Sequence, residues 1–143
     1  MKKVMRKILS IIVAASVVMA CFATTAFAQK STASAVGASY SAHVQDIGWQ
    51  AAVSDGADAG TTGQSLRLEA LKINLTNAPA GASIAYQVHV QDKGWVTPAS
   101  TDGAIAGTTG QSKRIEAIAI ALGGMPGYSV QYRVHVQDIG WMA

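Results

Sequence analysis

Residues 40–49 read YSAHVQDIGW, and closely similar segments stand at residues 86–95 (YQVHVQDKGW) and 132–141 (YRVHVQDIGW). The Tyr, His, Gln, Asp, Gly and Trp of this segment therefore recur every 46 residues. Self-similarity at a fixed period of about 20 to 50 residues is typical of repeat proteins, in which neighbouring units complete one another. The predicted units are residues 40–85, residues 86–131 and a partial copy at residues 132–143.

The N-terminus has the pattern of a secretory signal peptide. Four basic residues precede an apolar run from Ile8 to Ala20, and Ala26-Phe27-Ala28 places small residues at the two positions that a signal peptidase reads. We therefore expect a protein that is secreted or attached to the cell surface. The predicted parts are a signal peptide at residues 1–28, a flexible lead at residues 29–39 and the repeat domain at residues 40–143.

The only cysteine, Cys21, offers a less favoured alternative, which is anchoring as a lipoprotein. A bacterial lipobox usually has Leu three residues before the cysteine and a small residue two before it, whereas here Val18 and Met19 stand there. Removal of residues 1–28 would leave a chain without cysteine. Its stability outside the cell must then come from its core rather than from disulfides.

The charge balance argues against two classes of partner. The full chain has 11 basic and 8 acidic residues, but four of the basic residues belong to the signal peptide. Seven basic residues then remain against eight acidic ones, a net charge of −1. Without a basic face, neither nucleic acid nor anionic lipid is an expected partner. No membrane insertion is expected after signal removal, because no later segment reaches about 20 apolar residues.

Two kinds of segment have the two-residue period of a β-strand. In Tyr86–Gln91, apolar Tyr and Val alternate with polar Gln and His. The pattern extends back to Ile84 and recurs from Val130 to Gln137. The second kind is SLRLEALKINL at Ser65–Leu75, where Arg, Glu, Leu, Ile and Leu share a face, repeated at Ser112–Leu122. A helix is the alternative there, but β-branched residues and nearby Gly and Pro favour a strand.

Glycine-containing segments separate the predicted strands. Asp55-Gly56 and Asp102-Gly103 favour tight turns, because Gly accepts a positive φ. The GTTG segments at residues 60–63 and 107–110 are predicted to be tight connections. One additional residue between Trp95 and Asp102 predicts a surface loop in the second repeat. The Asp-x-Gly before each Trp predicts a bulge or a close backbone approach.

The predicted fold class is all-β, with repeated short antiparallel strands that form a pseudo-symmetric domain. Pairing of the last strand with the first would close it as a β-prism or a barrel-like structure. The alternative is an open repeat array, in which uncovered strand edges invite pairing with another chain.

The segments HVQxxGW, DGxxAGTTG and RxEA, at the positions given above, resemble the clostridial hydrophobic repeats with a Gly-Trp signature, known as ChW repeats. The resemblance covers nearly all of Tyr40 to Trp141. It implies a secreted or cell-surface protein of the kind that often carries these repeats in tandem, beside enzyme or adhesion domains. It also implies surface attachment, or binding to proteins or polysaccharides.

The repeated segment supplies the candidate ligand-binding residues. An indole can stack on the apolar face of a sugar ring while its N–H bonds to a hydroxyl, although the average burial of Trp favours the interpretation of each Trp as a core anchor. The Gln and Asp before each Trp would form the rest of the binding edge. The candidates are Trp49, Trp95, Trp141, Gln45, Gln91, Gln137, Asp46, Asp92 and Asp138.

Metal binding is the less favoured interpretation of the other repeated polar residues. A metal site at His43, His89 and His135 would need all three to converge within about 4 Å of one point, so polar residues on a strand face are expected instead. A calcium loop at Asp55-x-x-Asp58 is disfavoured because Ile105 replaces Asp58 in the second repeat. No metal and no cofactor are predicted.

The Arg and Glu of each RxEA segment are interpreted as structural ion pairs rather than as a polar ligand site. Arg67 with Glu69, and Arg114 with Glu116, lie two residues apart on one predicted strand. Because aliphatic residues follow each Glu, we expect the pairs to be partly buried, where removal of one partner costs more than at the surface.

We expect a non-catalytic extracellular binding or adhesion module that recognises a cell-surface or plant polysaccharide or a surface protein. One alternative is a structural self-assembly module, a homo-oligomer joined through open strand edges. The second is a small secreted hydrolase, which would need the three His residues and a carboxylate in one cleft. The segment GTTGQS lacks the Lys and the helix of a P-loop, and no Gly-x-Ser-x-Gly elbow is present, so no catalytic residue is predicted.

Overall fold

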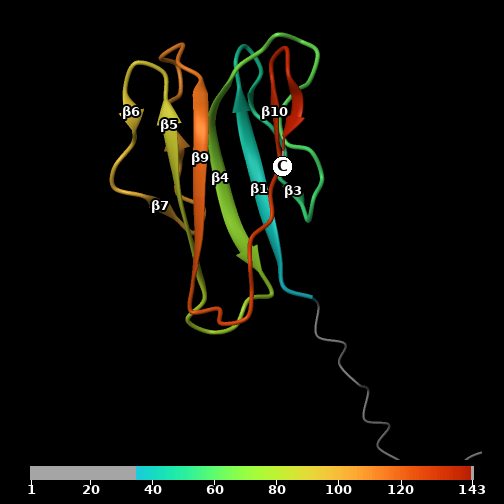
Figure 1. Ribbon diagram of the computed structural model, residues 1–143, viewed down its shortest axis with the longest axis vertical. Helices are drawn as coiled ribbons and strands as arrows, with labels where there is room; N and C mark the ends of the chain where they lie inside the picture. The colour runs from blue at the N-terminus through green and yellow to red at the C-terminus, as the bar shows by residue number, and fades with distance from the viewer. Residues whose placement is uncertain (1–34, 143) are drawn as a thin grey trace, which may run out of the picture. The chain divides into compact units, whose positions relative to one another are not determined.

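The computed structural model describes residues 35–142 and shows an all-β chain (Figure 1). None of these residues forms a helix, so this part of the chain has no helix that could cross a membrane. The predicted signal peptide, Cys21 and most of the predicted lead lie outside the described residues. The strands are β1 (Gly37–Val44), β2 (Gly48–Trp49), β3 (Val53–Ser54), β4 (Leu68–Thr76), β5 (Ser83–Val90), β6 (Gly94–Trp95), β7 (Ser100–Thr101), β8 (Ala106–Gly107), β9 (Ile115–Gly123), β10 (Val134–Val136) and β11 (Gly140–Met142).

Each of the first two repeats is built on one long antiparallel ribbon. β1 pairs with β4, and β5 pairs with β9 in the same register, so that Tyr40 lies opposite Ile73 as Tyr86 lies opposite Ile120. In these two repeats the strands predicted from the two-residue period are confirmed, and the helical alternative for residues 65–75 is wrong. The predicted lead is too long by three residues, because Gly37 to Ser39 already pair with β4.

A β-bulge interrupts both ribbons at equivalent positions. His43 lies opposite Ala70 while Val44 lies opposite Leu68, so Glu69 is the additional residue on β4. The predicted sharing of one face by Arg, Glu, Leu, Ile and Leu therefore fails at the Glu, and Leu68 joins the face of Leu71 and Ile73. β9 has the same bulge between the partners of His89 and Val90. A bulge bends its strand and changes where the following side chains point.

The Asp-x-Gly segments form hairpin turns, so the bulge predicted there is wrong. Ile47 N donates to Val44 O over 3.2 Å, and β2 then returns along β1. Asp46 has φ 62° and Gly48 has φ 86°, which lets the chain reverse within three residues. The predicted Asp-Gly turns are confirmed by positive φ at both residues of each pair.

The core lies where the two ribbons meet, along β4, β5 and β8. Strand β5 alternates strictly, and the side chains of its inner face are at most 2 % exposed: Ile84, Tyr86, Val88 and Val90. These pack with Leu71 and Ile73 of β4 and Ala106 of β8. Because Ile, Val and Leu dominate this layer, burial of apolar surface is the main stabilising contribution.

The sheets of the described chain remain open, so the open array is found rather than the closed form. One sheet has the order β2-β1-β4-β8 with β3 also on β1, and another has β6-β5-β7 with β9 also on β5. The third contains only β10 and β11. The strand predicted from Val130 is shorter than expected, since β10 begins at Val134 and pairs with β11 alone among the described strands.

Strand β8 belongs to the second repeat in sequence but to the first repeat in space. Ala106 lies opposite Leu71 and Gly107 opposite Ala70, on the edge of β4 that β1 leaves free. The second GTTG segment is therefore not only a tight connection, because its first Gly forms part of a sheet. A side chain at Gly107 has no room, since an added Cβ would lie 2.8 Å from the Cα of Ala70.

Candidate functional site

Each repeat places its Trp beside its His. The two residues lie directly opposite each other in the short hairpin, so the register of the strands fixes their contact. The rings meet edge to face, an arrangement that aromatic rings favour. The distances between ring centroids are 5.4 Å for His43–Trp49, 5.7 Å for His89–Trp95 and 5.3 Å for His135–Trp141.

The three indoles lie on the surface, and the interpretation as core anchors is therefore wrong. The exposed fractions are 36 % for Trp49, 47 % for Trp95 and 45 % for Trp141. Strand alternation explains this, because His89 and Trp95 point to the face opposite that of Val88 and Val90, which fill the core.

The Glu of the bulge contacts the same His. In the first repeat, Glu69 Oε2 lies 3.3 Å from His43 Nδ1 and Glu69 Oε1 accepts from Arg67 Nε over 2.9 Å. In the second, Glu116 lies 3.2 Å from His89 Nδ1 and 2.8 Å from Arg114. The predicted Arg–Glu pairs are confirmed, and each belongs to a Trp–His–Glu–Arg cluster that extends from the surface into the ribbon.

Burial distinguishes the two clusters. The side chain of Glu69 is 5 % exposed, whereas that of Glu116 is 31 % exposed. His43 Nδ1 is itself buried and has no hydrogen-bond partner within the described chain, although Glu69 Oε2 lies 3.3 Å away. The first cluster therefore has the closed environment of a structural element, and the second is open to solvent.

This difference predicts unequal effects of the same substitution. Glu69→Gln keeps the shape of the side chain but removes a buried charge from its partly buried partners His43 and Arg67, and we expect it to lower the free energy of unfolding by about 1 to 2 kcal/mol. The matched control, Glu116→Gln, should cost less than about 0.5 kcal/mol, because water screens the exposed pair. Urea unfolding at neutral pH measures both. Equal losses would contradict the structural role given to Glu69.

The surface above the indole also differs between repeats. Lys72 Nζ lies 4.3 Å from the ring centre of Trp49, and the guanidinium of Arg133 lies 4.3 Å from that of Trp141. Cations at such distances are attracted to the ring face and shield it. Lys72 lies opposite Ser41, and the equivalent pair in the second repeat is Ala119 and Gln87.

No cation lies over Trp95 in the described part of the chain, because neither residue of that equivalent pair is basic. The amide of Gln87 instead donates to Val96 O over 3.2 Å, beside Trp95. The Trp with the largest exposed fraction is therefore also the one whose ring lacks a cationic cover.

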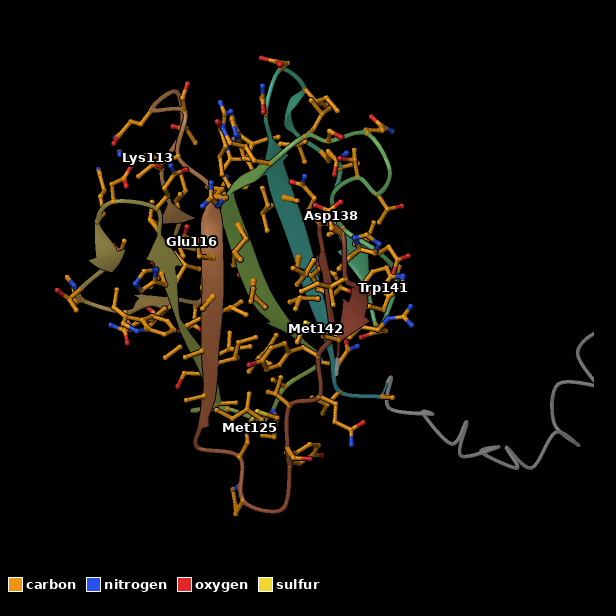
Figure 2. The ribbon with its side chains drawn as sticks, turned by 45° about the horizontal axis from the view of Figure 1, so that its top comes forward. Lys113, Glu116, Met125, Asp138, Trp141 and Met142 are labelled. Carbon is orange, nitrogen blue, oxygen red and sulfur yellow. The ribbon has the colours of Figure 1, made fainter. Side chains whose placement is uncertain are left out.

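The repeated Gln and Asp lie in the hairpin turns beside the indoles. Gln91 Oε1 accepts from Arg114 over 3.1 Å, and Asp92 lies 3.0 Å from Lys113 Nζ. Gln91 is thereby linked through Arg114, Glu116 and His89 to Trp95. In the first repeat, the amide of Gln45 donates to Asp46 instead. Gln137 and Asp138 are exposed in the third hairpin, on which Figure 2 labels Asp138 and Trp141.

The candidates thus form separate groups, one in each repeat, and the three His residues do not converge. Each His contacts the Trp of its own hairpin. Among residues 35–142, no three His, Cys, Asp or Glu side chains are grouped to hold a metal ion. Asp58, the last residue of the disfavoured calcium loop, lies 3.3 Å from Arg133.

An open all-β array with one surface Trp–His pair in each repeat defines the class as a tandem-repeat protein with repeated surface sites. A family model described as Clostridial hydrophobic W (ChW) matches residues 43–77 and residues 89–124. Each match begins at the His that contacts Trp and ends one residue after β4 or β9. The chain belongs to the ChW repeat family. Searches of the curated proteins and of the solved structures gave no match.

Proposed function

We propose that this protein is a non-catalytic binding module that acts outside the cell and binds a polysaccharide of a cell surface or of plant material. The observation that carries the proposal is the ring of Trp95, which is 47 % exposed, held edge-on by His89 and free of the cations that cover the other two rings. A rigid, exposed indole is suited to stack on the apolar face of a sugar ring.

Polar groups for sugar hydroxyls surround this indole. The guanidinium of Arg114 is 55 % exposed and Asp92 is 66 % exposed, so both retain capacity for further hydrogen bonds. Gln91 is joined to Arg114, which limits the freedom of both side chains. Side chains that are already ordered lose less entropy when a ligand binds.

The arrangement favours binding over catalysis. General acid and base roles require unlike environments, whereas the Trp–His–Glu–Arg cluster is repeated with the same residue types. A location outside the cell is supported by the signal-peptide pattern of residues 1–28, which argues for a partner found at a cell surface or in plant material.

Trp95→Ala is expected to weaken binding of soluble cell-wall or plant polysaccharide by at least about tenfold, or about 1.4 kcal/mol, measured by affinity electrophoresis and calorimetry. The matched control is Trp49→Ala, which should bind like the parent because Lys72 already covers that ring. Both variants should retain a cooperative melting transition, because neither indole fills the core.

Two results would contradict the proposal. The first is an equal loss of affinity in Trp95→Ala and Trp49→Ala, since the bare ring would then have no special role. The second is that the parent binds none of the polysaccharides tested but does bind a surface protein. The ligand would then be a protein rather than a sugar.

A further inference from the structure

Residues 103–108 of the second repeat lie along β4 of the first, and we call this contact the joint. It contains hydrogen bonds in addition to those of the ladder between β8 and β4. Thr108 N donates to Glu69 O over 2.9 Å, and Gly103 N donates to Ile73 O over 2.8 Å. Ile73 N donates over 3.1 Å to the hydroxyl of Tyr86. Residues 103–108 thus form hydrogen bonds with the backbone groups on the edge of β4 that faces away from β1. The joint therefore depends mainly on backbone groups.

The first repeat carries the same segment without a neighbouring strand. We call residues 56–61 the donor segment, because they are equivalent to residues 103–108. Gly60 has φ 107°, the same value as Gly107. A Cβ on Gly60 would meet nothing within 4 Å. Gly60 therefore already has the φ angle that Gly107 adopts in the joint, although no strand pairs with the donor segment among the described residues.

Two further differences follow from the missing strand. Ala59 is exposed, whereas the equivalent Ala106 is 3 % exposed between the sheets. Gly56 N donates to the hydroxyl of Tyr40 over 3.1 Å, whereas Gly103 N donates to the backbone of β4. The donor segment thus has an exposed Ala free for one apolar contact. Its backbone is bonded only within the first repeat, where Gly60 N donates to Gln50 Oε1 over 2.8 Å, and this bond would have to coexist with the new strand pairing or be exchanged for it.

The second repeat carries the matching acceptor. β9 has the same register on β5 as β4 has on β1, so the backbone groups of Glu116, Ile118 and Ile120 point away from β5. We call this the acceptor edge. Within residues 35–142, β9 pairs with no strand other than β5. The hydroxyl of Tyr132 donates to Ile118 O over 3.2 Å at this edge.

We propose that the donor segment of one chain adds to the acceptor edge of a second copy of the chain. By equivalence with the joint, Ala59 would lie opposite Ile118 and Gly60 opposite Ala117, while Thr61 N would donate to Glu116 O. The hydrogen bond from the hydroxyl of Tyr132 to Ile118 O would be replaced by a backbone hydrogen bond from the added strand.

A second copy fits because both halves of the joint are repeated in the sequence. Residues 55–63, which include the donor segment, read DGADAGTTG, and the equivalent residues 102–110 read DGAIAGTTG. The single difference, Asp58 for Ile105, falls at an exposed position, since Ile105 is 51 % exposed and the side chain of Asp58, although paired with Arg133, is 58 % exposed. The acceptor reads RIEAIAI and its equivalent RLEALKI. Because donor and acceptor are different surfaces, the contact is heterologous and adds chains head to tail.

A charge at residue 59 tests the proposal. Ala59→Glu leaves an exposed side chain in the single chain but would place a carboxylate where Ala106 is buried in the joint, and buried unpaired charges are strongly disfavoured. The matched control is Ala57→Glu, which adds the same charge two residues away, where both Ala57 and its equivalent Ala104 are exposed. Sedimentation equilibrium and light scattering measure the mass as a function of concentration.

The parent and Ala57→Glu should show a mass that rises with concentration beyond that of a dimer, while Ala59→Glu should remain at the mass of one chain. Ala59→Glu retains its acceptor edge, so its addition to the parent should shorten the assemblies, and addition of Ala57→Glu should not. Trp95→Ala should assemble like the parent, because this inference does not depend on polysaccharide binding. A parent that stays monomeric at millimolar concentration, or equal assembly of the two Glu variants, would overturn the inference.

Discussion

Gly107→Ala is expected to lower the free energy of unfolding by about 4 kcal/mol. About 1 to 3 kcal/mol of this comes from backbone strain, because an L-residue is forced to adopt φ 107°. A further 1 to 3 kcal/mol, roughly, comes from steric overlap, because the new Cβ would lie 2.8 Å from Ala70 Cα and contact the carbonyl of Glu69. The expected structural result is loss of the β8–β4 ladder while each long ribbon persists.

Gly60→Ala separates the two contributions. Gly60 has the same φ of 107°, but nothing lies within 4 Å of its Cβ position, so this variant should carry only the strain. We expect guanidinium unfolding at low protein concentration to show a difference of about 2 kcal/mol between the variants, and hydrogen exchange to show faster exchange at Thr108 N in Gly107→Ala alone. Equal stabilities would mean that the close approach of β8 to β4 contributes little.

Tyr86→Phe is expected to cost about 2 kcal/mol. The hydroxyl of Tyr86 accepts from Ile73 N in the first repeat and donates to Ala104 O in the second, so its removal leaves a buried backbone N–H without a partner. Tyr86 is only 1 % exposed. The matched control is Tyr40→Phe, whose hydroxyl binds Ala57 O and Gly56 N at the surface, where water replaces it at a cost below about 1 kcal/mol.

The same residue gives a pH dependence with a defined sign. Burial raises the pKa of Tyr86 above its ordinary value of 10.0, while backbone hydrogen bonds from Ile73 and Gly103 oppose this. Because the neutral phenol is favoured in the folded chain, its contribution is fully present below pH 10 and is lost as the pH rises toward the folded pKa. The stability difference between the parent and Tyr86→Phe should therefore shrink above pH 10. A constant difference up to pH 12 would contradict this.

Much of the secondary structure follows from the sequence because it depends on local patterns. The alternation in β5 and the Asp-Gly turns predicted their elements correctly, since each requires only neighbouring residues. The prediction that Glu69 shares the face of Leu71 and Ile73 is wrong because it depends on a contact distant in the sequence. A bulge shifts the alternation by one residue, and whether Leu68 or Glu69 faces the core depends on the partner strand rather than on β4 itself.

The site was predictable in its residues but not in its contacts. The period of 46 residues singles out Trp95 and its equivalents, yet their exposure follows from which face of the ribbon the core occupies. The approach of Lys72 to Trp49 requires the pairing of Ser41 with Lys72 across β1 and β4. An alignment of the two copies would have shown Ala119 in place of Lys72, but not that this replacement uncovers an indole.

The position of β8 has a consequence for how such chains can be divided and duplicated. The repeat in sequence runs from residue 40 to residue 85, but the sheet built on that repeat is completed only at Gly107. An expression fragment that ends at the sequence boundary would cut this sheet and expose the edge of β4, whereas one that ends after Gly110 would keep it whole. Each tandem duplication would likewise create one new joint from sequence already present, so such a chain can lengthen without the evolution of a new interface.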